Sequence, residues 1–260
     1  TGGTAAGALG PVTFVVMPRS LRRMLAMALV HHVLVWGVLP MLLAVVATEQ
    51  ERRALLGSIP VEPGAVGPYR AVRTTHATVV VSGIGPAAAA AAAATALAVH
   101  DYALVVSLGI CGGFRGAASF GDIVIATELI AADLGADSPE GFLGTGQLGW
   151  MDDVHPVDGA LVQTFADRLG PVVTGPVLTV STVTGTAARA GELAERHGAV
   201  AEAMEGWGVV EAARPHAIPV LEIRTVSNLV GKRDTRLWDF PAAFASLTRV
   251  GAAILESRWP

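Results

Sequence analysis

Short apolar segments alternate with helical patterns from residue 41 to the C-terminus. The apolar segments contain few polar residues, which is typical of strands in a sheet that is covered on both faces. They lie at residues 42–47, 102–108, 123–125, 129–132, 178–182, 199–203 and 220–226. Residues 69–75 and 78–82 flank a polar break and predict a hairpin. The pattern therefore predicts an α/β fold, a three-layer sandwich with a mixed central sheet.

Helices are expected between these segments. Residues 49–56 predict a short helix, and residues 241–256 predict a terminal one. An unbroken run of alanines at positions 87–94 follows Pro86, a residue that favours the first turn of a helix. We predict a helix there that packs closely against its neighbours. Residues 139–153 form a glycine-rich excursion long enough to be a lid or a substrate loop.

The N-terminal segment does not follow this pattern. Two arginines precede an apolar run within residues 20–43, as they would in a signal peptide or a membrane anchor. A pair of histidines and then Pro40 interrupt the run, which weakens the hydropathy signal. We predict that residues 1–40 are an extension outside the fold and that residues 41–260 form the functional domain, with a membrane anchor as the alternative.

Composition and charge narrow the class of protein. The chain has 260 residues and a formal net charge of −4, so nothing indicates a nucleic-acid partner. Cys111 is the only cysteine, which excludes a disulfide within this chain and fits a cytoplasmic location. The histidines are scattered without the spacing of metal ligands, so no metal is predicted. Neither a phosphate-binding loop nor a dinucleotide fingerprint is present, and no cofactor is predicted.

Two glycine-rich segments follow predicted strands, where open α/β sheets bind their ligands. Gly83-Ile84-Gly85 precedes a predicted helix, so its amides could hold an anion or a polarised water. Gly109-Ile110-Cys111-Gly112-Gly113 would let the backbone pass close to a flat ligand. A tight turn and a crowded crossover are the respective alternatives. Gly85 and Gly109 are the candidate substrate-binding positions in these segments.

Two later segments carry chemistry suited to a nucleoside. Met204-Glu205-Gly206 opens a predicted helix and offers an apolar surface beside a carboxylate that can bind vicinal hydroxyls. The strand that follows ends in Arg224-Thr225-Val226-Ser227-Asn228, whose amide can pair with a base edge. The two segments together indicate an enzyme that acts on a nucleoside.

These segments, taken in order, resemble the purine nucleoside phosphorylase and nucleosidase superfamily and, within it, the futalosine hydrolases of menaquinone biosynthesis. The resemblance covers residues 41–256. It rests on Glu49-Gln50-Glu51-Arg52, Ser82-Gly83-Ile84-Gly85, Gly109 to Gly113, Ala203-Met204-Glu205-Gly206 and Arg224 to Asn228. It implies a homo-oligomer that hydrolyses the N-glycosidic bond of futalosine, giving hypoxanthine and dehypoxanthine futalosine without a cofactor.

The resemblance also implies contacts to the substrate. Cleavage develops positive charge on the ribose and negative charge on the leaving base, so both ends need stabilisation. Glu205 is implied at the ribose hydroxyls and Met204 against the sugar, with Ser227 in the same binding site. Arg233 and Lys232 could meet the benzoate carboxylate of futalosine, or could be a solvated pair at the surface.

A hydrolase must activate a water molecule. The resemblance implies Glu51 as the general base, with Ser82 and Arg224 holding the water. Glu49 is the competing candidate for the base, because the match to the usual nucleosidase pattern is one residue short. For Arg224, the alternative is a surface ion pair.

Asn228 and Ser107 distinguish the expected reaction from its alternatives. Adenine-cleaving relatives have an aspartate at the position of Asn228, whereas an amide can donate to N7 or O6 of a 6-oxopurine. Related phosphorylases can hold phosphate with an arginine where this chain has Ser107, so water is the expected nucleophile. The alternatives are a purine nucleoside phosphorylase, an adenine-releasing nucleosidase and a non-catalytic nucleoside-binding protein.

Overall fold

The structure is a computed structural model that describes residues 41–256, so the predicted extension at residues 1–40 lies outside the described residues. Its longer strands are β1 (Leu42–Val46), β2 (Glu62–Val66), β3 (Tyr69–Arg73), β4 (Ala77–Val81), β5 (Leu104–Gly113), β6 (Ile123–Ala131), β10 (Val173–Thr179) and β12 (Val220–Leu229). Its shorter strands are β7 (Gly135–Ala136), β8 (Leu143–Gly144), β9 (Val154–Pro156) and β11 (Ala201–Ala203). Its helices are α2 (Glu49–Leu56), α3 (Pro86–Val99), α4 (Gly159–Leu169), α5 (Ala187–His197), α6 (Gly206–Ala213) and α7 (Phe240–Ile254). Across residues 41–256, no helix is long and apolar enough to span a bilayer.

The main sheet is mixed, as predicted. Its strand order is β11-β10-β6-β12-β5-β1-β4-β3-β2, with β9 added beside β6. β12, β5, β1 and β4 run parallel, whereas β6 is antiparallel to β12. β11 pairs with β10 and also with β5, so the strands β5, β11, β10, β6 and β12 form a closed ring.

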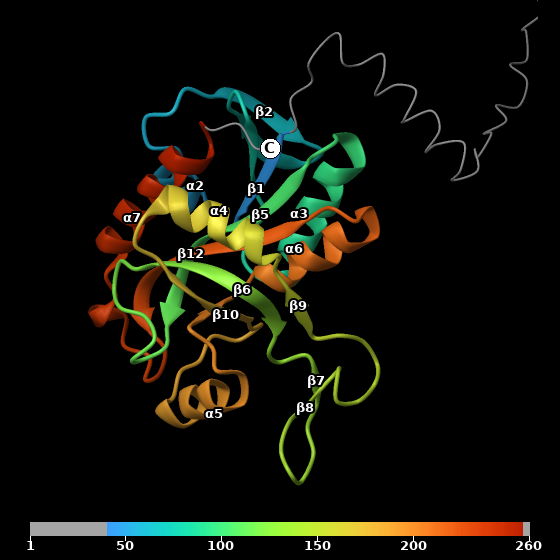
Figure 1. The fold of residues 1–260 in the computed structure, drawn as a ribbon, viewed down its shortest axis with the longest axis vertical. Coiled ribbons are helices and arrows are strands. Elements are labelled where there is room, and N and C mark those ends of the chain that lie inside the picture. Colours follow the sequence, from blue (N-terminus) through green and yellow to red (C-terminus); the bar gives the residue numbers. More distant parts are fainter. Residues whose placement is uncertain (1–40, 257–260) are drawn as a thin grey trace, which may run out of the picture. The chain divides into compact units, whose positions relative to one another are not determined.

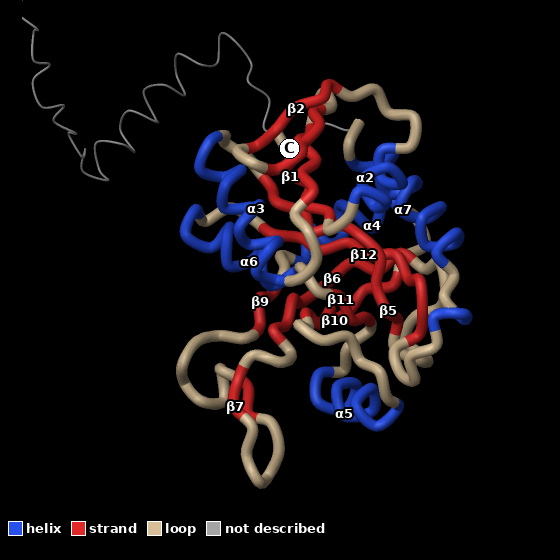
Figure 2. The backbone as a smooth tube through the Cα atoms, turned by 180° about the vertical axis from the view of Figure 1, so that it is seen from behind, coloured by secondary structure: helices blue, strands red, loops and turns tan. Residues whose placement is uncertain are grey.

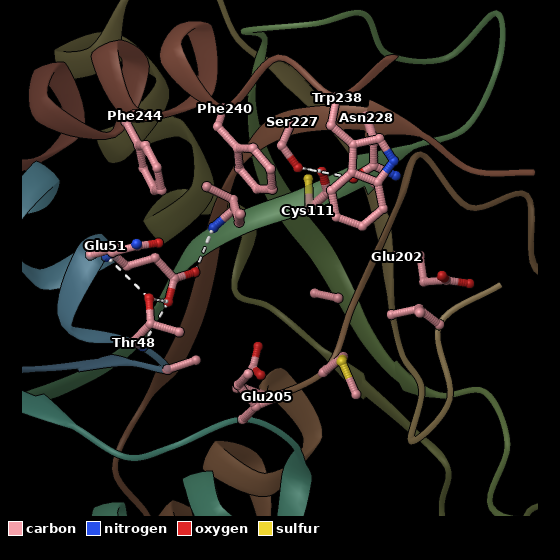
Figure 3. Close-up of a pocket in the computed structure, with 18 of the residues that line it drawn as sticks. Thr48, Glu51, Cys111, Glu202, Glu205, Ser227, Asn228, Trp238, Phe240 and Phe244 are labelled. Carbon is pink, nitrogen blue, oxygen red and sulfur yellow. Dashed lines mark hydrogen bonds between the residues drawn. The ribbon is translucent and has the colours of Figure 1, made fainter. Parts of the chain in front are cut away.

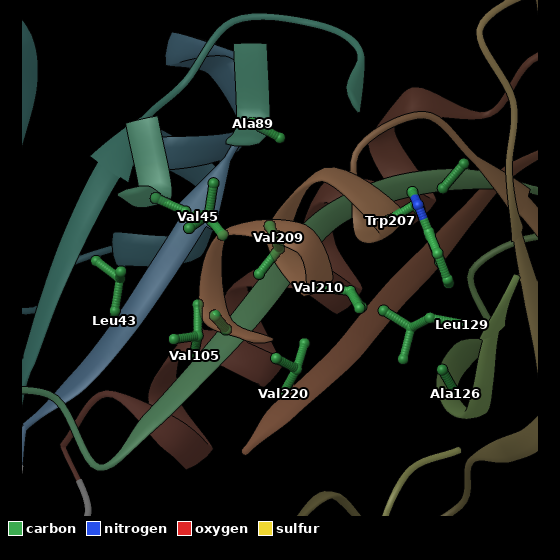
Figure 4. Close-up of a cluster of buried hydrophobic side chains, with 14 of the residues drawn as sticks. Leu43, Val45, Ala89, Val105, Ala126, Leu129, Trp207, Val209, Val210 and Val220 are labelled. Atoms are coloured by element: carbon green, nitrogen blue, oxygen red, sulfur yellow. The ribbon is translucent and has the colours of Figure 1, made fainter. Parts of the chain in front are cut away.

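Helices cover both faces of this sheet (Figures 1 and 2). On one face, buried alanines of α3 pack with Val209 and Val210 of α6 against the strands (Figure 4). A side chain at Gly208 would clash with the backbone of Pro86, which shows how closely these two helices approach. On the other face, α2, α4 and α7 contribute side chains such as Leu55, Phe165 and Leu247 to a second core. The predicted α/β sandwich and the closely packed alanine helix are confirmed.

Several predicted boundaries are wrong. Residues 109–113 are not a loop at a strand end but the second half of β5, because β12 and β11 both pair with them. The strands expected at residues 123–125 and 129–132 are one continuous strand, β6. The strand β2 and the helices α4 and α5 were not predicted.

The predicted hairpin and terminal helix are confirmed as β3–β4 and α7. The glycine-rich excursion at residues 139–153 contains β8, which pairs with β7 just before the excursion to form a small hairpin that projects from the main sheet (Figure 1). Trp150, in this segment, is 66% exposed. Its role as a lid stays a prediction.

Candidate active site

A cavity of about 390 Å³ opens beside the ends of β1, β11 and β12 and over the second half of β5. This is the edge at which α/β sheets bind ligands, and the volume suits a small molecule. The candidate residues that line it are Glu51, Met204, Glu205, Ser227 and Asn228. Figure 3 shows Glu51 and Asn228 at opposite ends, with Glu205 below them. Five of the nine predicted site residues therefore share one cavity.

The other four candidates do not line the cavity. Ser82 is buried, and its hydroxyl donates to the carbonyl of Gly83 at 2.8 Å. Gly85 donates its amide N–H to the carboxylate of Glu205. Gly109 and Arg224 lie beneath the cavity floor, where a side chain on the glycine would clash with Arg224.

Glu51 is held at the start of α2 by the local sequence. Thr48 is the N-cap residue, and its backbone N–H donates to Glu51 Oε2 at 2.8 Å in a capping box. Glu51 Oε1 accepts from the amide of Ile110 in β5 at 3.0 Å, so the carboxylate is fixed from two elements. The side chain is buried, and this burial raises the pKa of Glu51. A buried carboxylate with a raised pKa is suited to accept a proton near neutral pH.

Glu49, the competing candidate, lies in a different environment. It does not line the cavity and forms an ion pair with Arg52, whose Nε donates to Glu49 Oε2 at 2.9 Å. This hydrogen bond lowers the pKa of Glu49. The structure therefore brings Glu51, rather than Glu49, to the cavity.

Glu205 occupies the N-cap position of α6 but does not cap the helix with its side chain. Its Oε1 instead accepts from the amide of Gly85 at 3.0 Å, and its Oε2 lies 3.1 Å from Arg224 Nη1. The Gly83-Ile84-Gly85 loop therefore binds an anion supplied by the protein itself. Glu205 is held by these contacts with its carboxylate in the cavity wall.

Arg224 is fully buried in the middle of β12, not at a strand end as predicted. Its Nε donates to Glu222 Oε1 at 2.8 Å, and its Nη2 donates to Ser107 Oγ at 2.7 Å. Burial acts to lower the pKa of Arg224, but the nearby carboxylates, led by Glu222, raise it above its usual value. The guanidinium is therefore a permanent buried cation.

Glu222 was not predicted as a site residue, although the sequence carries a signal for it. Residues two positions apart on a strand point to the same face, so Glu222-Ile223-Arg224 places an acid beside a base. Ser107 was singled out only as a replacement for an arginine. In the structure its hydroxyl is fully buried and is committed to Arg224.

Asn228 reaches the cavity because of a β-bulge in β12. Val226 pairs with Cys111 and Asn228 pairs with Gly112, so Ser227 is an extra residue in the strand. Without it, the next residue would point to the opposite face of the sheet. The Ser227 hydroxyl lies within hydrogen-bond distance of two acceptors, Asn228 Oδ1 at 2.9 Å and the Cys111 carbonyl at 3.1 Å. The Asn228 amide nitrogen donates to the Leu229 carbonyl at 3.5 Å, which leaves its second hydrogen available to a ligand.

An aromatic wall runs along one side of the cavity (Figure 3). The rings of Trp238 and Phe240 have centroids 5.5 Å apart, and Phe240 and Phe244 stack at 6.0 Å. The guanidinium of Arg233 lies 5.7 Å from the centre of the Trp238 ring. Phe240 and Phe244 were not predicted as site residues, although their spacing of four residues places them on one helix face.

Two other side chains that line the cavity, Cys111 and Glu202, belong to residue types that can act as nucleophiles or metal ligands. Burial raises the pKa of the Cys111 thiol to about 12, so it is not a thiolate nucleophile. Within residues 41–256, no group of three His, Cys, Asp or Glu side chains could hold a metal ion. Glu202, which also lines the cavity, accepts from the Thr184 amide at 2.8 Å.

Known proteins resemble this chain in sequence and in fold. The family model of the phosphorylase superfamily matches residues 42–257. A futalosine hydrolase of Streptomyces coelicolor is 52% identical over 70% of this chain and 80% of that protein. A futalosine hydrolase of Acidothermus cellulolyticus is 44% identical over 74% of this chain and 81% of that protein.

Solved structures share the fold at low sequence identity. The 5'-methylthioadenosine/S-adenosylhomocysteine nucleosidase of Neisseria meningitidis superposes with a TM-score of 0.73 at 22% identity, over 84% of this chain and 99% of that one. The futalosine hydrolase of Helicobacter pylori superposes with a TM-score of 0.70 at 16% identity, over 83% of this chain and 96% of that one.

Proposed function

This chain belongs to the phosphorylase superfamily and, within it, to the futalosine hydrolases, and from that premise we propose that it hydrolyses the N-glycosidic bond of futalosine. The products are hypoxanthine and dehypoxanthine futalosine, an intermediate of menaquinone biosynthesis. The single observation that carries the choice of base is Asn228. Its oxygen faces the Ser227 hydroxyl, and its nitrogen keeps one hydrogen, beyond the 3.5 Å contact to the Leu229 carbonyl, to donate to the base.

Water is activated by Glu51 in this proposal. The water oxygen forms a bond to C1′ of the ribose and its proton passes to the Glu51 carboxylate, which acts as general base. Arg224 supports this step from below the floor, because its Nη1 is directed toward the same space. Ser82 contributes through the loop it stabilises, since its hydroxyl bonds to the backbone.

Glu205 stabilises the ribose as the C1′–N9 bond breaks. Positive charge develops on the sugar, and a carboxylate bound to its hydroxyls interacts more strongly with the transition state than with the substrate. Met204 provides the apolar surface beside the sugar in the same cavity. The bonding electrons leave with the base, whose N7 or O6 accepts from the Asn228 amide.

Ser107 supports hydrolysis over phosphorolysis. A phosphate dianion needs a charge-assisted partner such as a guanidinium. At this position the chain has a buried hydroxyl that is already bonded to Arg224. Water, which is neutral, needs no such partner.

The proposed enzyme is a cytoplasmic homo-oligomer. Leu134 and Met151 line a second cavity beside α3 and α6, and the adjacent Trp150 is largely exposed. Exposed apolar side chains gathered in one region are typical of a protein–protein contact. Sedimentation of the purified protein tests this, because a monomer would contradict it.

The function is tested by incubating the protein with futalosine and measuring free hypoxanthine by chromatography. Hydrolysis predicts the same rate with and without phosphate. A rate that depends on phosphate, with a sugar phosphate as product, would show a phosphorylase. Faster cleavage of aminofutalosine would show an adenine-releasing nucleosidase, and binding without turnover would show a nucleoside-binding protein.

A further inference from the structure

We propose that Glu222 is a positioning residue that holds Arg224 so that one guanidinium nitrogen stays directed at the reacting centre. This inference rests on the proposed function, because it assigns Glu222 a part in the same cleavage. Glu222 lies beneath the cavity floor and does not line it. It acts on the substrate only through Arg224 and Glu205.

The sheet places four positions together. Glu222 and Arg224 lie two residues apart on β12 and therefore point to one face. They pair in register with Ser107 and Gly109 of β5. The serine provides an acceptor beside the glutamate, and the glycine provides space beside the arginine.

The three guanidinium nitrogens of Arg224 have different partners. Nε donates to Glu222 at 2.8 Å, and Nη2 donates to Ser107 at 2.7 Å. Nη1 lies 3.1 Å from Glu205 Oε2 but forms no hydrogen bond within the described part of the chain. Nε and Nη2 are therefore fixed below the cavity floor, and Nη1 remains available on the side of the cavity.

Nη1 points to the space between the two catalytic carboxylates. A side chain at Gly109 would clash both with Glu51 Oε1 and with Arg224 Nη1, so these two atoms lie on either side of one small space. Glu205 Oε2 contacts the same nitrogen. A cation at this point can orient a water molecule and balance the charge of both acids.

Glu222 also contacts the segment that carries Glu205. A side chain at Gly206 would clash with both carboxylate oxygens of Glu222, so the start of α6 lies directly against this group. Glu222 Oε2 has no hydrogen-bond partner in the described residues. One fully buried carboxylate thus fixes the guanidinium and supports the backbone beside the ribose-binding acid.

Removing Glu222 should redirect Arg224. A buried guanidinium without this partner would turn more of its donors toward Glu205, because paired bidentate contacts are the favoured geometry. Glu205 would then be drawn away from the ribose hydroxyls. The result would be a loss of discrimination between substrates that have these hydroxyls and substrates that lack them.

The experiment compares Glu222→Leu and Glu222→Gln with wild type on futalosine and on its 2′-deoxy analogue. Glu222→Leu should lower kcat on futalosine by about tenfold or more and should reduce the ratio of kcat/KM between the two substrates by about tenfold. Glu222→Gln keeps an oxygen that can accept from Arg224 Nε, so both values should stay within about threefold of wild type.

Thr225→Val is the matched control. Thr225 is fully buried and adjacent to Arg224 in β12, but it points to the opposite face of the strand. This variant should keep the substrate ratio of wild type. It therefore separates an effect on Arg224 from a general effect of substitution in β12.

An unchanged ratio in folded Glu222→Leu, with activity lost equally on both substrates, would overturn the inference and leave Glu222 a structural residue. If Glu222→Leu does not fold, Glu222→Asp decides, because its shorter side chain withdraws the acceptor from Arg224 Nε and should lower the ratio by a smaller factor. An unchanged ratio there overturns the inference too. A wild type that releases no hypoxanthine would contradict the proposed function instead.

Discussion

The two ends of the cavity are built from different chemistry. At one end, Glu51, Glu205 and Arg224 are buried and charged, and each is fixed by contacts to two or more chain segments. At the other end, Asn228 is a neutral amide, and Trp238 beside it is partly exposed. Both ends open into one cavity about 390 Å³ in volume.

This difference separates two tasks. Charge removed from water interacts strongly with a charged transition state, so the first end is suited to bond cleavage. A neutral donor costs less to bury and discriminates between bases by the direction of its hydrogen bond. We therefore expect substitutions at the charged end to lower turnover and substitutions at the amide end to change the preferred nucleobase.

The largest effect is expected for Glu205→Gln. Loss of the negative charge at the ribose should lower kcat on futalosine by about two orders of magnitude, as for other single electrostatic contacts to a transition state. Steady-state kinetics of the folded variant tests this. Turnover close to wild type would show that Glu205 does not stabilise the transition state.

Asn228→Asp should change specificity more than rate. A carboxylic acid can accept from a 6-amino group and protonate N7, so the preference should move from futalosine toward aminofutalosine. We expect the ratio of kcat/KM for the two substrates to change by about tenfold or more, the size of one misplaced buried hydrogen bond. An unchanged ratio would mean that Asn228 does not select the base.

Acidification should lower the activity through the charged end of the cavity alone, by protonating Glu51. Burial raises the pKa of Glu51, and the general base must be ionised, so kcat/KM should fall as the pH decreases through that raised pKa. The acid limb of the pH profile should therefore lie above the usual glutamate value of about 4.3. A limb at or below that value would argue against Glu51 as the base.

The smallest effect is expected for removal of residues 1–40. Every residue assigned to either end of the cavity lies within residues 41–256. A chain that starts at Met41 should keep the kcat, KM and substrate ratio of the full chain. Reduced activity, or membrane association of the full chain in fractionation, would show a role for the N-terminal segment.

The alternating pattern was sufficient to predict the sandwich, because buried strands and helices leave strong periodic signals. It was not sufficient for residues 109–113, since five residues that include three glycines look like a loop. Their strand pairing depends on β11 and β12, which are distant in sequence. Glycine there serves close packing rather than a turn, as the clashes at Gly109 and Gly112 show.

The site was predicted to a similar extent. Glu51, Glu205 and Asn228 line one cavity, and they could be singled out because their motifs are local in sequence. Glu222 was not given a role, because the guanidinium that it holds is fixed jointly by Glu222 and by Ser107, and Ser107 is 117 positions away from Arg224 along the chain. Hydrogen bonds between neighbouring strands are set by register, and a single sequence does not reveal register.

The bulge at Ser227 has a consequence for how such an enzyme can diverge. The extra residue divides β12 into an upstream half that holds Arg224 and a downstream half that presents Asn228. The side chain at position 228 can therefore be exchanged while the upstream pairing stays intact. We expect that a change of preferred nucleobase can therefore arise at position 228 without a change in the residues that hold Arg224.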